Sequence, residues 1–164
     1  DKPDSREICF VPSNNYLDFL RRRQPEFDGS GEIVDMAGKV LARHEGFQGY
    51  TVGQRGGLGV ALGERRYVVR IEADEHRVVI GSREDLLGRM LTADRVNWLI
   101  EPPTALFQCD AKIRYLHEAA AATVTPRENG QALVEFDEPQ SAITPGQAVV
   151  FYDGDRVLGG GFIL

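Results

Sequence analysis

The sequence predicts a mainly β protein in which a small α+β domain is followed by a six-stranded β-barrel. Glycine is frequent, with 18 among 164 residues. Turn-forming pairs such as Asn-Gly and Asp-Gly recur between short apolar segments, a pattern typical of short strands rather than long helices. Six such segments follow one another in roughly the last 80 residues, and their closure into a barrel would remove exposed strand edges.

The first part of the chain is expected to hold one helix and two hairpins. Ser13 can cap a helix with an apolar stripe that consists of Tyr16, Leu17, Phe19 and Leu20. The arginines at 21–23 suit the negative end of the helix dipole, and a phosphate contact is the alternative interpretation. A linker at residues 25–31 precedes strand pairs at residues 32–36 with 39–42 and 66–73 with 77–80.

A short helix or turn at residues 85–90 marks the expected boundary before the barrel. The predicted domains are therefore residues 1–27, 28–84 and 85–164. The first of these is expected to be the tail of a preceding domain, and the second a central domain. The expected barrel strands are residues 96–100, 106–115, 120–125, 131–136, 148–152 and 156–164.

Composition excludes several classes of protein. The chain is 42% hydrophobic and 27% charged, as is usual for soluble globular proteins, and no apolar run approaches the ~18 residues of a membrane span. No secretory signal is present, and the absence of an initiator Met predicts a fragment or a processed product. Two lone cysteines suit a reducing compartment, so a cytoplasmic protein is expected.

The net charge of −6 argues against indiscriminate binding of nucleic acid. The charge is uneven, however. Residues 37–72 hold six Lys/Arg and three Asp/Glu, whereas residues 86–164 hold six Lys/Arg and ten Asp/Glu. Any contact with RNA is therefore expected to be local and dependent on shape.

Both cysteines have a structural interpretation. Cys9 lies between apolar residues, which favours a buried structural thiol over a functional one, since only Arg6 is nearby in sequence to lower its pKa. Cys109 lies on the apolar face of an alternating strand, together with Phe107, Ala111, Ile113 and Tyr115. The two cysteines and three scattered histidines show no metal-ligand spacing, so no metal is predicted.

The densest unusual stretch is residues 44–59, HEGFQGYTVGQRGGLG. Its glycines would let the backbone approach a ligand closely, and Arg55 could clamp a phosphate. No Gly-Lys-Ser/Thr follows, so the stretch is not a nucleotide-binding P-loop, and the dinucleotide fingerprint is also absent. A tight irregular loop without a ligand is the alternative interpretation.

Four segments in order resemble one family, the tRNA-specific 2-thiouridylases. The segment KPDSREICFV at 2–11 resembles the second-cysteine motif of that family, and residues 44–59 resemble its central-domain signature. AKIRY at 111–115 and TPGQAVVFYDGDRVLGGG at 144–161 resemble its C-terminal barrel. The resemblance covers the whole chain and implies a barrel similar to the second domain of elongation factor Tu.

The resemblance implies a two-step reaction on tRNA. ATP, bound by an N-terminal domain, adenylates the C2 oxygen of the wobble uridine. Sulfur from a sulfur-relay protein or cysteine desulfurase then reaches an enzyme cysteine and displaces AMP. This chain lacks a Ser-Gly-Gly-Val-Asp-Ser loop for ATP and a first catalytic cysteine. No cofactor is therefore expected on this chain, which alone is predicted to be inactive.

The resemblance also assigns site residues. Cys9 matches the persulfide-carrying cysteine, which reverses the interpretation from composition, although some members of the family are described with an iron–sulfur cluster there instead. Arg114, Tyr115 and Gln147 match positions that contact tRNA, and Arg55 is a further candidate for an RNA contact.

Two departures from the family reduce positive charge. Gly56 stands where the family usually has Lys, and Leu116-His117 stands where it usually has Arg-Gln. The main alternative function is a non-catalytic barrel that docks RNA or protein. A barrel that binds a small molecule such as flavin is a third reading.

Overall fold

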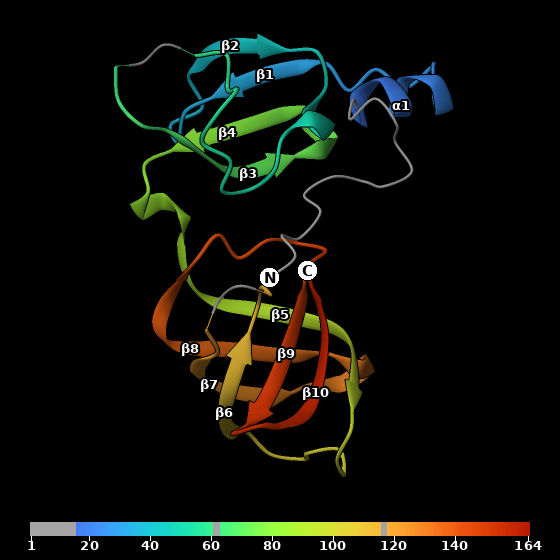
Figure 1. Ribbon diagram of the computed structural model, residues 1–164, viewed down its shortest axis with the longest axis vertical. Helices are drawn as coiled ribbons and strands as arrows, with labels where there is room; N and C mark the ends of the chain where they lie inside the picture. Colours follow the sequence, from blue (N-terminus) through green and yellow to red (C-terminus); the bar gives the residue numbers. More distant parts are fainter. Residues whose placement is uncertain (1–15, 61–62, 116–117) are drawn as a thin grey trace, which may run out of the picture. The chain divides into compact units, whose positions relative to one another are not determined.

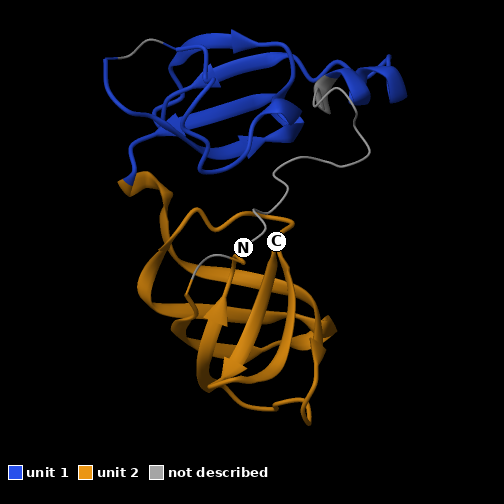
Figure 2. Ribbon diagram, viewed as in Figure 1, with its two compact units in different colours: residues 1–83 blue, residues 84–164 orange. Residues whose placement is uncertain are grey.

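The computed structural model describes residues 16–60, 63–115 and 118–164 of the chain. Figure 1 shows the order of the elements, and Figure 2 shows the two compact units into which the chain divides, residues 1–83 and 84–164. Strands dominate both units, and the second unit is a closed barrel. The predicted fold class, mainly β with a small α+β domain before a six-stranded barrel, is confirmed.

The first unit contains helix α1 (Tyr16–Arg23) and a four-stranded sheet. Its strands are β1 (Gly31–Val34), β2 (Val40–His44), β3 (Tyr67–Glu72) and β4 (Arg77–Gly81), in the order β2-β1-β4-β3. The two predicted hairpins are confirmed, and β1 joins them through parallel pairing with β4. Ser13, the expected helix cap, lies outside the described residues.

Alternating apolar residues build the core of this small unit. Five buried side chains form it: Ile33, Leu58, Val68, Val78 and Ile80. Four of them come from the sheet, whereas Leu58 comes from the glycine-rich stretch between β2 and β3. The loop is therefore anchored to the core by an apolar residue, so its position is defined by burial as well as by hydrogen bonds.

The second unit is a closed antiparallel barrel. Its strands follow the order β10-β5-β8-β7-β6-β9, and β9 closes the ring by pairing with β10. The bounds are β5 (Leu87–Trp98), β6 (Phe107–Lys112), β7 (Ala120–Pro126), β8 (Ala132–Ser141), β9 (Ala148–Asp153) and β10 (Arg156–Ile163).

Both large aromatic and small alanine side chains line the interior of the barrel. Phe136 and Phe151 are almost completely buried. The ring of Trp98 stacks on Phe151, with 5.5 Å between the ring centroids. In β10, which pairs with both β5 and β9, a Cβ on Gly160 would lie 2.6 Å from the Val149 carbonyl oxygen. The run of three glycines in β10 thus allows the neighbouring backbones to approach closely.

The structure corrects three sequence predictions. The strand expected at residues 96–100 is only the end of the longer strand β5, which begins at Leu87 and ends at Trp98. The expected helix or turn at residues 85–90 is only a 3-10 turn, Glu84–Leu86, because Leu87 already begins the 12-residue strand β5. Tyr115 was predicted to lie on the apolar face of its strand, but that strand ends at Lys112 and the side chain of Tyr115 is 79% exposed. Alternation therefore does not extend beyond the hydrogen-bonded ladder.

Among the described helices, none is long and apolar enough to cross a membrane.

Candidate nucleic-acid interface

Arg114 fastens the chain after β6 to the turn after β8. Its Nη2 atom donates hydrogen bonds to the Ala142 carbonyl oxygen at 2.7 Å and to Thr144 Oγ1 at 3.1 Å. The Thr144 hydroxyl also donates to the Ala142 carbonyl, at 2.8 Å. Ala142 is buried and has a φ of +55°, a backbone conformation that is rare for residues other than glycine. The three hydrogen bonds therefore stabilise a turn with an unfavourable backbone conformation.

The same turn positions Gln147. The backbone N–H of Gln147 donates to the Thr144 carbonyl at 3.2 Å, and its own carbonyl accepts from the N–H of Ile163 at 2.8 Å. Gly146, with a φ of +83°, also donates to the Ile163 carbonyl, at 2.8 Å. The backbone of Gln147 is therefore fixed on two sides, while its side chain is exposed.

Arg114, Tyr115 and Gln147 lie at one end of the barrel. Lys112, the last residue of β6, pairs with Val150 near the start of β9, and Gln147 directly precedes β9. Figure 1 shows the end of β6 and the segment between β8 and β9 at the same end of the barrel. The structure thus brings together the three residues that the sequence singled out for tRNA.

This end of the barrel offers groups suited to RNA. Only Nη2 of Arg114 is engaged by the described residues, which leaves the other guanidinium donors for a phosphate. The exposed ring of Tyr115 can stack on a base, and the amide of Gln147 can both donate and accept. Sequence reasoning missed Ala142 and Thr144 because their role depends on contact across the barrel.

The described cysteine is unsuited to carry sulfur. Cys109 packs against the barrel core, and burial, aided by the charge of Asp110, raises the pKa of its thiol to about 11. The thiol is therefore protonated near neutral pH, and a protonated thiol is a poor nucleophile. Cys9, the predicted persulfide carrier, lies outside the described residues.

The glycine-rich stretch forms an ordered loop beside β3. The N–H of Gly53 donates to the Val68 carbonyl at 2.8 Å, and the N–H of Val68 donates to the Gln54 carbonyl at 2.9 Å. The side chain of Gln54 accepts from the N–H of Thr51 and donates to the Gly56 carbonyl. Arg55 follows this fixed point and is exposed.

Arg55 shares a pocket with Arg65 and Arg66, which sequence reasoning did not connect to it. The signal was the adjacent pair of arginines at the start of the strand predicted for residues 66–73. The backbone hydrogen bond between Val68 and Gln54 brings these arginines close to Arg55, and local sequence patterns do not predict this contact.

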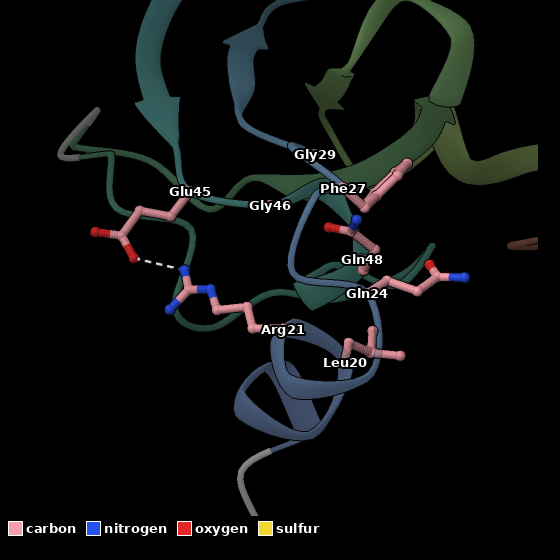
Figure 3. Close-up of a pocket in the computed structure, with 8 residues that line it drawn as sticks. All are labelled: Leu20, Arg21, Gln24, Phe27, Gly29, Glu45, Gly46 and Gln48. Atoms are coloured by element: carbon pink, nitrogen blue, oxygen red, sulfur yellow. Dashed lines mark hydrogen bonds and ion pairs between the residues drawn. The ribbon is translucent and has the colours of Figure 1, made fainter.

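A second pocket separates α1 from the loop after β2 (Figure 3). Arg21 Nη2 lies 2.9 Å from Glu45 Oε2 across this pocket, so one residue of the arginine triplet forms an ion pair within the unit. The side chain of Gln48 occupies the space beside two glycines: a Cβ on Gly29 would lie 2.3 Å from its amide nitrogen, and one on Gly46 would lie 2.7 Å from its amide oxygen.

His44, at the end of β2, is buried with both ring nitrogens lacking a hydrogen-bond partner among the described residues. Its ring packs against Tyr50, with 5.4 Å between the centroids. Burial lowers the pKa of His44, so the neutral ring is favoured. Groups of three or more His, Cys, Asp or Glu that could hold a metal ion do not occur among the described residues.

Two family models cover most of the chain. One described as "tRNA methyl transferase PRC-barrel domain" matches residues 17–82, and one described as "Aminomethyltransferase beta-barrel domain" matches residues 88–163. These matches define the class of the two units, which resemble a PRC-barrel domain described for tRNA methyl transferases and a β-barrel domain described for aminomethyltransferases.

Curated relatives narrow this class to one family. A tRNA-specific 2-thiouridylase MnmA of Chlorobium chlorochromatii is 48% identical over 99% of this chain and 46% of its own length. The protein of the same name in Heliobacterium modesticaldum is 50% identical over 99% of this chain and 43% of its own length. The chain is therefore similar to the tRNA-specific 2-thiouridylases over nearly its whole length. It spans less than half the length of these relatives.

Proposed function

We propose that this chain is the tRNA-binding and sulfur-relay portion of a cytoplasmic enzyme that 2-thiolates the wobble uridine of tRNA. The names of the relatives support tRNA as the substrate. The observation that carries the proposal is the hydrogen-bonded turn held by Arg114, because it brings Arg114, Tyr115 and Gln147 to one end of the barrel.

Each of the three residues contacts a different part of the RNA in this proposal. Arg114 binds a phosphate through its remaining N–H donors, a contact that fixes the register of the RNA without reading its sequence. Tyr115 stacks on an unpaired base or donates its hydroxyl, and Gln147 hydrogen-bonds a ribose or a base edge. Because the barrel unit is acidic overall, with six Lys/Arg against twelve Asp/Glu in residues 84–164, binding depends on these few local contacts.

The sulfur step belongs to Cys9 in this proposal. A sulfur-relay protein or cysteine desulfurase transfers its outer persulfide sulfur to the Cys9 thiolate, so that the donor leaves as a thiolate. The outer sulfur of the Cys9 persulfide then attacks C2 of the adenylated uridine, and AMP departs with the original oxygen, which leaves the uridine joined to Cys9 through a disulfide. A second thiol, from outside this chain, attacks the Cys9 sulfur, so that 2-thiouridine is released and the second thiol forms a disulfide with Cys9. ATP for the adenylation is bound outside this chain. Cys109 takes no part, because its thiol stays protonated.

Binding of a fluorescent tRNA to the 164-residue chain tests the RNA part. Arg114→Ala is expected to weaken binding about fivefold or more, which corresponds to ~1 kcal/mol or more for a lost charge-assisted contact. Arg156→Ala, at the opposite end of β9 and β10, is the matched control. Tyr115→Ala and Gln147→Ala, both at exposed positions, separate lost contacts from misfolding. Unchanged binding in all three variants would refute this interface.

Mass spectrometry tests the sulfur part. After incubation of the chain with a cysteine desulfurase and free cysteine, we expect a mass increase of one sulfur on Cys9. The increase should persist in Cys109→Ser and disappear in Cys9→Ser. If tRNA binds but Cys9 never acquires sulfur, the chain acts as a non-catalytic docking module instead.

A further inference from the structure

We propose that the glycine-rich loop and the segment before β3 form a phosphate-binding pocket for the RNA backbone, with Arg55, Arg65 and Arg66 as its cationic groups. This proposal rests on the proposed function, because it assumes that the chain binds tRNA. It adds a second point of contact in the first unit, separate from the end of the barrel.

The fold brings the three arginines together from two segments. Val68 and the loop exchange backbone hydrogen bonds, through Gly53 and Gln54, at 2.8 and 2.9 Å. Arg55 directly follows Gln54, and Arg65 and Arg66 lie just before β3, in which Val68 is the second residue. The side chain of Gln54 braces the loop from both sides, as described above, so Arg55 starts from a defined position.

The pocket has room for a ligand, and glycines leave part of its backbone accessible. Its volume is about 460 Å³, and among the described residues it is lined by the three arginines with Gly57, Leu58, Gly59, Val60 and Glu64. Gly57 and Gly59 adopt φ values of +69° and +70°, and no atom would lie within 4 Å of a Cβ added at Gly59. Glycine there keeps the backbone accessible to a bulky anion.

The charges of the pocket are not balanced within it. Glu64 forms an ion pair with Arg66. Arg55 and Arg65 have no ion-pair partner among the described residues, which leaves two uncompensated positive charges in the lining. Moreover, Arg66 Nε is buried without a hydrogen-bond partner in the part of the chain that the structure describes. Like charges held close together repel, and a phosphate relieves this repulsion.

Guanidinium groups suit phosphate in particular. The planar fork of arginine matches the two free oxygens of a backbone phosphate, and arginine is used widely to bind the phosphates of nucleic acids. Arg55 and Arg65 are exposed, so they can reach a polymer that stays in solvent.

The distribution of charge favours RNA over a small anion. Residues 1–83 hold thirteen Lys/Arg and thirteen Asp/Glu, whereas residues 84–164 carry the whole net charge of −6. A polyanion is therefore repelled less by the first unit than by the barrel. An RNA backbone also gains from several phosphate contacts at once, which a free phosphate cannot do.

The test measures the affinity for fluorescent tRNA of the wild-type chain and of two double variants across a range of salt concentrations. Arg55→Ala/Arg65→Ala should weaken binding about tenfold or more. It should also make the negative slope of log K against log salt shallower by about 1 to 2, because up to two phosphate contacts are lost. The control is Arg43→Ala/Arg70→Ala. It removes two exposed arginines from β2 and β3 that are already paired with Glu32 and Glu72, and it should change both quantities much less.

Inorganic phosphate is the second probe, monitored by NMR of the arginine Nε–H groups. Weak millimolar binding that the pocket variant abolishes, together with its weaker tRNA binding, supports the RNA assignment. Phosphate binding with unchanged tRNA affinity in the pocket variant overturns that assignment in favour of a free phosphate site. Equal effects of the two double variants on tRNA also overturn it, while a separate loss in Arg114→Ala would leave the proposed function intact. If wild-type chain binds no tRNA, the proposed function fails along with the RNA assignment.

Discussion

The two units present their cations in different ways. In the barrel, Arg114 is half-buried and its guanidinium is tied to the Ala142 carbonyl and the Thr144 hydroxyl. In the first unit, Arg55 and Arg65 are exposed on loops and have no ion-pair partner among the described residues. In the proposed interfaces, the acidic barrel therefore offers RNA one accurately placed arginine, whereas the neutral first unit offers several.

This difference follows from how each unit is built. A closed barrel ends in turns that strands on both sides hold in place, so a side chain at the end of one strand can reach the turn of another. The open four-stranded sheet leaves a long connection between β2 and β3. Such connections tolerate glycine and charge and are where binding residues concentrate.

The largest expected effect concerns the barrel core. Phe151→Ala should lower the free energy of unfolding by about 3–5 kcal/mol, because it removes a fully buried ring. Fluorescence during urea unfolding reports on this directly, since Trp98 is the only tryptophan of the chain and stacks on Phe151. A loss below about 1 kcal/mol would mean that the ring is not in the core.

Loss of the half-buried Arg114 should lower the free energy of unfolding more than loss of the exposed Arg55. Arg114→Ala leaves the buried Ala142 carbonyl without a charged donor, so we expect a loss of about 1–3 kcal/mol in the free energy of unfolding. Arg55→Ala, on an exposed loop, should change it by less than about 0.5 kcal/mol. Urea unfolding of both variants checks this, and equal losses would erase the distinction between the units.

A smaller effect should appear as a dependence on pH in the first unit. Burial lowers the pKa of His44 below its ordinary value of 6.5. In acid, the unfolded chain therefore takes up a proton before the folded chain does. Stability should be complete above about pH 6.5 and fall as the pH drops towards the folded-state pKa.

The matched variant is His44→Phe, which keeps a ring beside Tyr50 but cannot titrate. Urea unfolding at about pH 7.5 and about pH 5.5 should show a smaller difference for this variant than for the wild type. Glu72 does not interfere, because its hydrogen bond with Arg70 lowers its pKa below 4.5. An identical pH dependence in both proteins would show that His44 titrates normally.

The smallest effect is expected at the ion pair between α1 and the loop after β2. Arg21 and Glu45 have side chains that are 52% and 87% exposed, so water screens their attraction. Arg21→Gln should therefore cost less than about 1 kcal/mol of stability. A larger loss in thermal unfolding would mean that this pair, rather than burial, fixes the end of α1.

Local patterns predicted most of the strands but missed residues 87–95 of β5, and they predicted contacts across the fold poorly. The alternation of Phe107, Cys109 and Ala111 correctly placed Cys109 towards the core. The same alternation misplaced Tyr115, because nothing in the sequence marks the end of pairing at Lys112. Residues 85–90 were predicted as a helix or turn, whereas β5 already begins at Leu87 and has a bulge between Gly88 and Met90.

The candidate sites depended on information beyond local pattern. Arg114 and Gln147 were found through family resemblance, and the hydrogen bonds that relate them required the closed barrel. Arg65 and Arg66 had no such motif. Their link to Arg55 arises from the pairing of Val68 with Gln54, which joins segments on either side of a loop.

Ultraviolet crosslinking of the wild-type chain to tRNA, followed by mass spectrometry of the crosslinked peptides, tests the central claim most directly. We predict crosslinks on the peptides that carry Tyr115 and Gln147. Crosslinks confined to the other end of the barrel, at the turn between β9 and β10, would contradict the proposed interface.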